Sequence, residues 1–258
     1  FGTGLRARFH FVAILFSKFW IIGCAVLPVG LGKRTLTLAD PRPGSASKGG
    51  TMAANIDYYF TCASPFCYLG HRLFCDIAEK HKATVNFKAV NLKDVWAVSG
   101  AVPPGERPPV RQRMRLVELQ RQAHYRKLPI KIEPKFWPMD PGFADRIAVG
   151  LVESGIDPRY FINKVLGGLW AYDDDIRDEH VLASYLSQCG LDPLPALTDA
   201  KTDWAEEIRR NNARAAIGAD VVGVPTYVYN GEAFFGQDRL EHLDQALSEG
   251  RAPFVAPR

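Results

Sequence analysis

The sequence has few of the residues that build redox or metal centres. It holds five cysteines in 258 residues, and no two of them form a Cys-x-x-Cys pair. An odd number of cysteines without a regular framework is typical of a reducing compartment such as the cytoplasm. The six histidines show no metal-ligand spacing. We therefore expect no metal and no dithiol redox motif.

An excess of positive charge is also missing from most of the chain, although the formal net charge is +4. Residues 1–51 hold seven of the 32 Lys and Arg and only one of the 28 Asp and Glu. The residues beyond 51 therefore carry slightly more acidic than basic side chains. This balance argues against a surface that binds nucleic acid.

Residues 1–51 differ from the rest of the chain in composition. Residues 9–32 are largely apolar but interrupted by Lys18, and residues 42–51 are rich in Pro, Gly and Ser. The segment could be a signal peptide or a short membrane anchor. The sequence begins with Phe, and its first Met is Met52. We therefore favour the interpretation that residues 1–51 are a non-native or disordered leader, and we expect no membrane partner.

A strand-to-helix transition is predicted at residues 56–72. Residues 56–61 are aromatic-rich and suit a buried strand. Ser64 then occupies an N-cap position, and Pro65 the first position of a helix predicted to run to about residue 81. Free N–H groups and the helix dipole at such a place stabilise an anion, including a thiolate. The alternative is that Ser64 is only a helix cap.

A second motif lies near the other end of the chain. Residues 223–226 (Gly-Val-Pro-Thr) lead into an apolar run, and Asn230-Gly231 then signals a two-residue hairpin. Residues 235–240 (Phe-Gly-Gln-Asp-Arg-Leu) precede a last predicted helix. Together with residues 64–69 (Ser-Pro-Phe-Cys-Tyr-Leu), these motifs resemble the 2-hydroxychromene-2-carboxylate isomerase family. That family belongs with the kappa-class glutathione transferases and the DsbA-like oxidoreductases.

The resemblance covers residues 55 to about 250 and implies an α/β thioredoxin-like fold with an inserted all-helical domain. In that fold the Val224-Pro225 bond is cis. We expect residues 52–93 and 218–250 to form the two halves of the thioredoxin-like domain, with residues 251–258 as a tail. The inserted domain would span residues 94–217. We expect a loop-rich crossing over residues 91–105, then helices over residues 107–127, 143–155, 158–172, 179–189 and 202–217.

The resemblance also implies glutathione as the cofactor. Thioredoxin-like domains bind an extended peptide by strand-like pairing before the cis-proline. Val224, before Pro225, would pair with the cysteinyl unit, and the thiol would point at Ser64, the catalytic residue. The γ-glutamyl end would be held by Phe235, Gly236, Gln237 and Asp238.

For the second substrate, the resemblance suggests Lys93, Trp96 and Arg121 as binding residues. The remaining arginines of the helix over residues 107–127 are interpreted as a solvated face, and so are His71 and Arg72 on the first helix. Trp170 is expected in the core.

The implied activity is a glutathione-dependent isomerase of the 2-hydroxychromene-2-carboxylate type, acting on a small aromatic or electrophilic substrate in aromatic-compound catabolism. It is expected in the cytoplasm, as a homodimer. The alternative is a kappa-class-like glutathione S-transferase, because the fold alone does not separate the two. A DsbA-like oxidoreductase using Cys67 and a non-catalytic glutathione-binding protein are the further alternatives.

Overall fold

The computed structural model describes residues 53–257, so the predicted leader, residues 1–51, lies outside the described residues. A four-stranded mixed sheet has the order β2-β1-β3-β4. Its strands are β1 (Asn55–Phe60), β2 (Thr84–Ala89), β3 (Thr226–Tyr229) and β4 (Glu232–Phe235). β1 runs parallel to β2 and antiparallel to β3, and β4 runs antiparallel to β3. The α/β thioredoxin-like fold predicted from the sequence is therefore confirmed.

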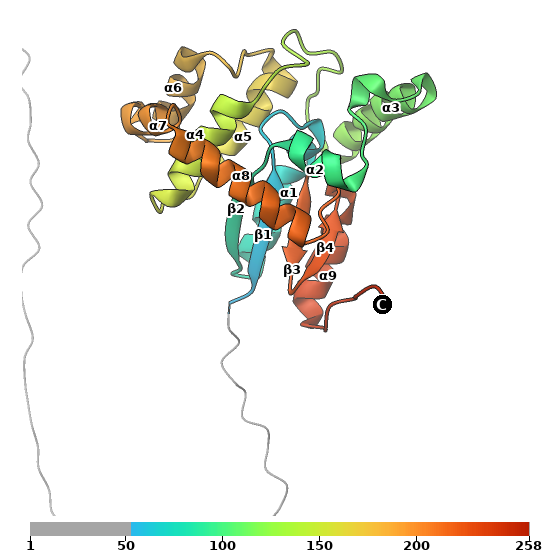
Figure 1. Ribbon diagram of the computed structural model, residues 1–258. Helices are drawn as coiled ribbons and strands as arrows, with labels where there is room; N and C mark the ends of the chain where they lie inside the picture. Colours follow the sequence, from blue (N-terminus) through green and yellow to red (C-terminus); the bar gives the residue numbers. More distant parts are fainter. Residues whose placement is uncertain (1–52, 258) are drawn as a thin grey trace, which may run out of the picture. The chain divides into compact units, whose positions relative to one another are not determined.

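Helices surround this sheet (Figure 1). α1 (Pro65–Lys80) joins β1 to β2, and α9 (Leu240–Glu249) follows β4. The chain between β2 and β3 is helical: α2 (Leu92–Ser99), α3 (Pro109–Arg126), α4 (Gly142–Glu153), α5 (Arg159–Gly167), α6 (Glu179–Gln188), α7 (Pro193–Asp199) and α8 (Asp203–Gly218). α1 contacts α9, and α4 and α8 contact β2. Figure 1 shows α8 crossing in front of the strands, with α3 projecting to one side.

Two helices were not expected from the sequence. α2 replaces the predicted loop-rich crossing, because Asn91 caps its first turn by accepting the N–H of Lys93 and Gly100 ends it in a left-handed conformation. α7 begins after Asp192, whose side chain accepts the N–H of Leu194. Both helices are short, so their side-chain periodicity is too brief to predict them. The single helix predicted over residues 158–172 is α5 followed by a π-helical turn at Gly168–Tyr172.

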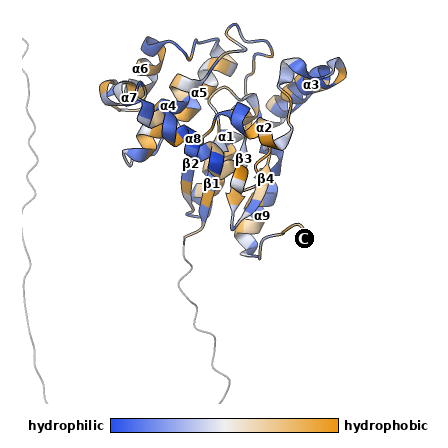
Figure 2. Ribbon diagram, viewed as in Figure 1, coloured by the Kyte–Doolittle hydropathy of each residue, from blue (hydrophilic) through white to orange (hydrophobic). Residues whose placement is uncertain are grey.

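The core is built around β1. Tyr58 is fully buried, with its ring 5.1 Å from that of Tyr227 and 4.7 Å from that of Phe74 on α1. Trp170 is also fully buried, as predicted. Figure 2 shows hydrophilic residues over much of α3, where few side chains are buried. Packing of the aromatic face of β1 against α1 thus fixes the start of α1 relative to the sheet.

None of the helices in the described part of the chain is long and apolar enough to span a membrane.

Candidate active site

Ser64 lies in the turn between β1 and α1. It is the N-cap of α1, with extended backbone angles, and its Oγ accepts the N–H of Cys67 at 3.2 Å. Pro65 occupies the first helical position, as predicted. Ser64 is only 7% exposed. The Oγ–H is therefore positioned to donate to a group placed at the helix N-terminus, where the dipole favours negative charge.

A buried carboxylate supports this turn from behind. Asp145 on α4 accepts the Thr61 hydroxyl at 2.9 Å and the Cys62 N–H at 2.7 Å. Arg209 on α8 lies 3.2 Å from the same carboxylate, and both side chains are buried. Burial raises the pKa of Asp145, while Arg209 and the hydrogen bonds from Cys62 and Thr61 oppose the rise. This pair is a feature that the sequence analysis missed.

The segment before β3 approaches Ser64 from the sheet. The Val224-Pro225 peptide bond is cis, as the resemblance predicted. Thr226 pairs with Tyr59, so in the same antiparallel register Val224 runs beside the end of β1 that leads to Ser64. Within residues 53–257 neither the N–H nor the C=O of Val224 has a backbone partner. An extended peptide could therefore pair with Val224 next to Ser64.

Two aromatic side chains flank this segment. A Cβ at Gly223 would lie 3.1 Å from the ring of Phe235 and 3.9 Å from the indole nitrogen of Trp96. Phe235 is half-exposed at the end of β4. The structure thus brings two of the predicted site residues together around Gly223, one from α2 and one from the hairpin.

Gln237 is the most tightly held residue of the segment 235–240. It is 2% exposed and packs on α1, where a Cβ at Gly70 would lie 2.7 Å from the Gln237 Cβ. Arg126 Nε donates to Gln237 Oε1 at 3.2 Å, and Arg126 Nη2 donates to the Gln237 carbonyl at 3.0 Å. Arg126 was assigned to a solvated face, but its side chain is only 11% exposed. It anchors the predicted γ-glutamyl subsite.

Gly236 and Asp238 lie on either side of Gln237. Gly236 has a φ of +104° and donates its N–H to the Pro225 carbonyl at 2.8 Å. This bond connects the segment 235–240 to the cis-proline segment. Asp238 is half-exposed and forms an ion pair with Arg239 at 2.9 Å. Its side chain does not cap α9, whose N-cap is Arg239.

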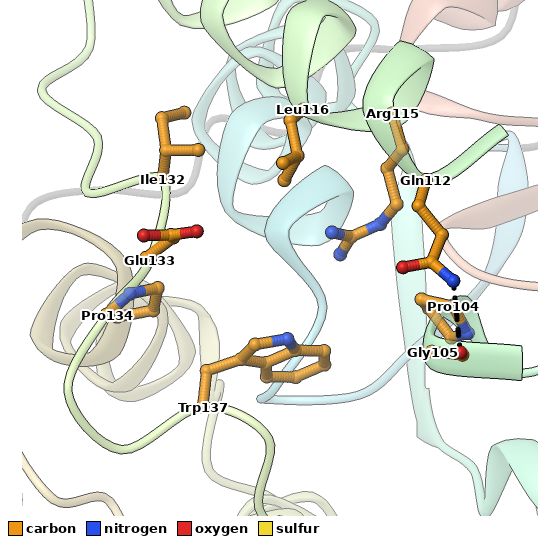
Figure 3. A pocket seen from close by; sticks show the side chains of 9 residues that line it. All are labelled: Pro104, Gly105, Gln112, Arg115, Leu116, Ile132, Glu133, Pro134 and Trp137. Atoms are coloured by element: carbon orange, nitrogen blue, oxygen red, sulfur yellow. Dashed lines mark hydrogen bonds between the residues drawn. The ribbon is translucent and has the colours of Figure 1, made fainter. Parts of the chain in front are cut away.

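A cleft of about 350 Å³ lies between α3 and the chain that follows it (Figure 3). Its walls include Gln112, Arg115, Leu116, Glu133 and Trp137. The guanidinium carbon of Arg115 is 6.0 Å from the ring of Phe66, on the first turn of α1. Through Arg115, one wall of the cleft therefore lies near the first turn of the helix that Ser64 caps. Its residues were not singled out from the sequence, and Arg115 was wrongly assigned to a solvated face.

The remaining predicted substrate residues do not line this cleft. Lys93 is exposed on α2. Arg121 is exposed on α3 and pairs with Glu118 one turn away. His71, assigned to a solvated face, is 1% exposed, and its Nε2 lies 2.9 Å from the Arg159 carbonyl. That interpretation of His71 is wrong, whereas Arg72 is exposed as expected.

Cys67 lies three residues after Ser64, at the position that the second cysteine of a Cys-x-x-Cys motif would occupy. It is fully buried, and burial raises the pKa of its thiol to about 12. A thiol is reactive as the thiolate, so Cys67 is a poor nucleophile at neutral pH.

The comparisons with known proteins agree with this geometry. Over 208 residues the chain is 27% identical to 2-hydroxychromene-2-carboxylate isomerase from Pseudomonas putida, a match covering 74% of this chain and 93% of that protein. It is 24% identical to glutathione S-transferase kappa 1 from Caenorhabditis elegans, over 75% of this chain and 91% of that protein. Both relatives are enzymes.

A solved structure of a 2-hydroxychromene-2-carboxylate isomerase superposes with a TM-score of 0.64 and 26% identity, covering 76% of this chain and 95% of that chain. The model of the DSBA-like thioredoxin domain matches residues 55–248. The chain therefore belongs to the DSBA-like thioredoxin domain family, and within it the chain is similar to 2-hydroxychromene-2-carboxylate isomerase.

Proposed function

We propose that the protein is a glutathione-dependent isomerase of the 2-hydroxychromene-2-carboxylate type. The observation that carries the proposal is the position of Ser64. A hydroxyl, and not a thiol, caps α1 beside the cis-proline segment. Such a site can stabilise the thiolate of a bound peptide but cannot exchange a disulfide with it.

The residues of the site fit glutathione. The unpaired backbone groups of Val224 would hold its cysteinyl unit, and Trp96 and Phe235 flank that position. Gln237, with Asp238 beside it, would take the γ-glutamyl end. Within the described residues the amide NH₂ of Gln237 forms no hydrogen bond, so it can donate to a ligand carboxylate.

Bound glutathione would supply a thiolate that adds reversibly to a conjugated carbon, which allows rotation about a former double bond before elimination. Ser64 Oγ–H would donate to the sulfur and keep it ionised. An ordinary thiol, with a pKa near 8.5, is only about a few per cent ionised at neutral pH. The N-terminus of α1 would favour the same charge through its dipole. The buried pair of Asp145 and Arg209 would hold the Ser64 turn in place.

The isomerase and the alternative, a kappa-class-like transferase, differ in what happens to glutathione. Purified protein would be given 2-hydroxychromene-2-carboxylate in large excess over glutathione. We expect many turnovers to the trans-alkene product with the free thiol concentration unchanged. Consumption of one thiol per product would favour the transferase, and binding without any turnover would favour a glutathione-binding protein.

A further inference from the structure

Arg115 is a half-buried cation without a counter-ion in the described structure. It lines the cleft beside α3, and within residues 53–257 its guanidinium forms neither an ion pair nor a hydrogen bond. Most other arginines of the described chain pair with an acid. A buried or half-buried charge that lacks a partner is costly. An anion bound in the cleft would supply that partner.

The surroundings of Arg115 strengthen the positive potential. Residues 107–115 contain four arginines and no acid. Burial lowers the pKa of Arg115, and the neighbouring charge of Arg107 lowers it further. Gln112 Nε2 donates to the carbonyls of Gly105 at 3.0 Å and Arg107 at 2.7 Å, which holds this wall of the cleft in shape.

Aromatic side chains lie beside the cleft, and side chains of opposite charge lie on its two sides. The Arg115 guanidinium lies 5.8 Å from the ring of Trp137 and 6.0 Å from that of Phe66, two residues beyond Ser64. Figure 3 shows Arg115 reaching into the cleft above Trp137, with the Glu133 carboxylate on the opposite side. Arg115 and Glu133 form no ion pair with each other, so the space between them is open to a ligand. Its volume is in the range of small-molecule sites.

We propose that this cleft holds the second substrate, and that Arg115 binds a carboxylate carried by a planar, conjugated apolar body. The body would lie against Trp137, and the anionic end would meet the guanidinium fork, which matches carboxylate geometry. This inference rests on the proposed function, which supplies the reaction that the bound second substrate would undergo. Lys93 and Arg121, which the resemblance suggested as binding residues for the second substrate, do not line this cleft.

The test measures binding without turnover. Cinnamate and its neutral isostere cinnamamide would be titrated by calorimetry into wild-type protein, Arg115→Gln and Arg113→Gln. Arg113 is the matched control, because it lies exposed on α3 outside the cleft. We expect wild type and Arg113→Gln to bind the acid roughly tenfold more tightly than the amide, as one charge-assisted contact would give. In Arg115→Gln the ratio should fall to near one.

Arg115→Lys keeps the positive charge but loses the bidentate geometry of the guanidinium, so it should keep part of the preference for cinnamate over cinnamamide. This variant also serves as a second test if Arg115→Gln fails to fold. Glutathione affinity should be equal in all four proteins. Absence of cinnamate binding, no preference for the acid in wild type, or equal loss in Arg113→Gln would overturn the proposal. A selective loss of glutathione affinity in Arg115→Gln would assign Arg115 to the cofactor and overturn it as well. None of these results alters whether Ser64 ionises bound glutathione, so the two proposals can fail separately.

Discussion

The Asp145 carboxylate, fully buried on α4, accepts the backbone N–H of Cys62 at 2.7 Å, two residues before Ser64. This contact joins the helical layer to the turn that carries Ser64, the proposed catalytic residue. Arg209 balances the charge at 3.2 Å. Loss of Arg209 would leave the Asp145 carboxylate buried without its counter-charge, whereas loss of Asp145 would leave Arg209 with Glu206, 3.4 Å away, as an acidic partner.

The first prediction concerns this pair. Asp145→Ala should lower the free energy of unfolding by roughly 3–5 kcal/mol, because it removes the buried partner of Arg209 and leaves the Thr61 hydroxyl and the Cys62 N–H without their acceptor. Arg209→Leu should cost a similar amount. The double variant should cost clearly less than the sum, since no lone charge remains. Urea unfolding of the four proteins measures the coupling, and additive losses would show that the two side chains act independently.

The second prediction concerns Gly70, which lets η3 (Gln237–Arg239) approach α1. In Gly70→Ala the new methyl would lie 2.7 Å from the Gln237 Cβ, so Gln237 must move. We expect a loss of about 1–3 kcal/mol in stability and weaker glutathione binding by calorimetry. Gly218→Ala, at the end of α8 in open space, is the control and should be neutral or slightly stabilising. Unchanged glutathione affinity in Gly70→Ala would remove Gln237 from the binding site.

The third prediction concerns pH. Burial lowers the pKa of His71 to about 4, from an ordinary value of 6.5. The neutral imidazole therefore stabilises the fold above pH 6.5, and this contribution is lost as the pH falls toward 4. The loss from this group alone should be about 3 kcal/mol. His71→Gln keeps a donor for the Arg159 carbonyl but does not titrate. The stability difference between wild type and His71→Gln should shrink on acidification, and a constant difference would show that His71 does not titrate in this way.

Local sequence signals made the Ser64 turn and the hairpin between β3 and β4 predictable. The N-cap, the proline at the first helical position and the Asn230-Gly231 turn each depend on neighbours in sequence, and the structure has all three. Gly236 and Gln237 were identified through the resemblance, and the structure ties both to the elements around Ser64.

The missed residues depend on contacts between distant segments. Arg126 is held by Gln237, 111 residues away, and His71 by the carbonyl of Arg159, 88 residues away. Periodicity could not predict how α3 docks, because this helix exposes Met114 and Val117 while half-burying Arg115. Whether an arginine on such a helix faces solvent or a cleft is decided by the packing of α3 on α1.

The central claim is that Ser64 stabilises a thiolate. Ser64→Ala removes one charge-assisted hydrogen bond, worth about 1.5–3 kcal/mol. Bound glutathione should then titrate roughly one to two pH units higher than in wild type. Its affinity should change less, because Val224, Gln237 and Asp238 are untouched. Some depression of the thiol pKa should remain, since the N-terminus of α1 stays in place.

The most direct measurement is the ultraviolet thiolate absorbance of bound glutathione against pH, in wild type and in Ser64→Ala. We predict two separate titration curves, with the variant displaced toward alkaline pH by one to two units, as one lost hydrogen bond to the sulfur requires. Superimposed curves would contradict the account, because Ser64 would then be only the cap of α1.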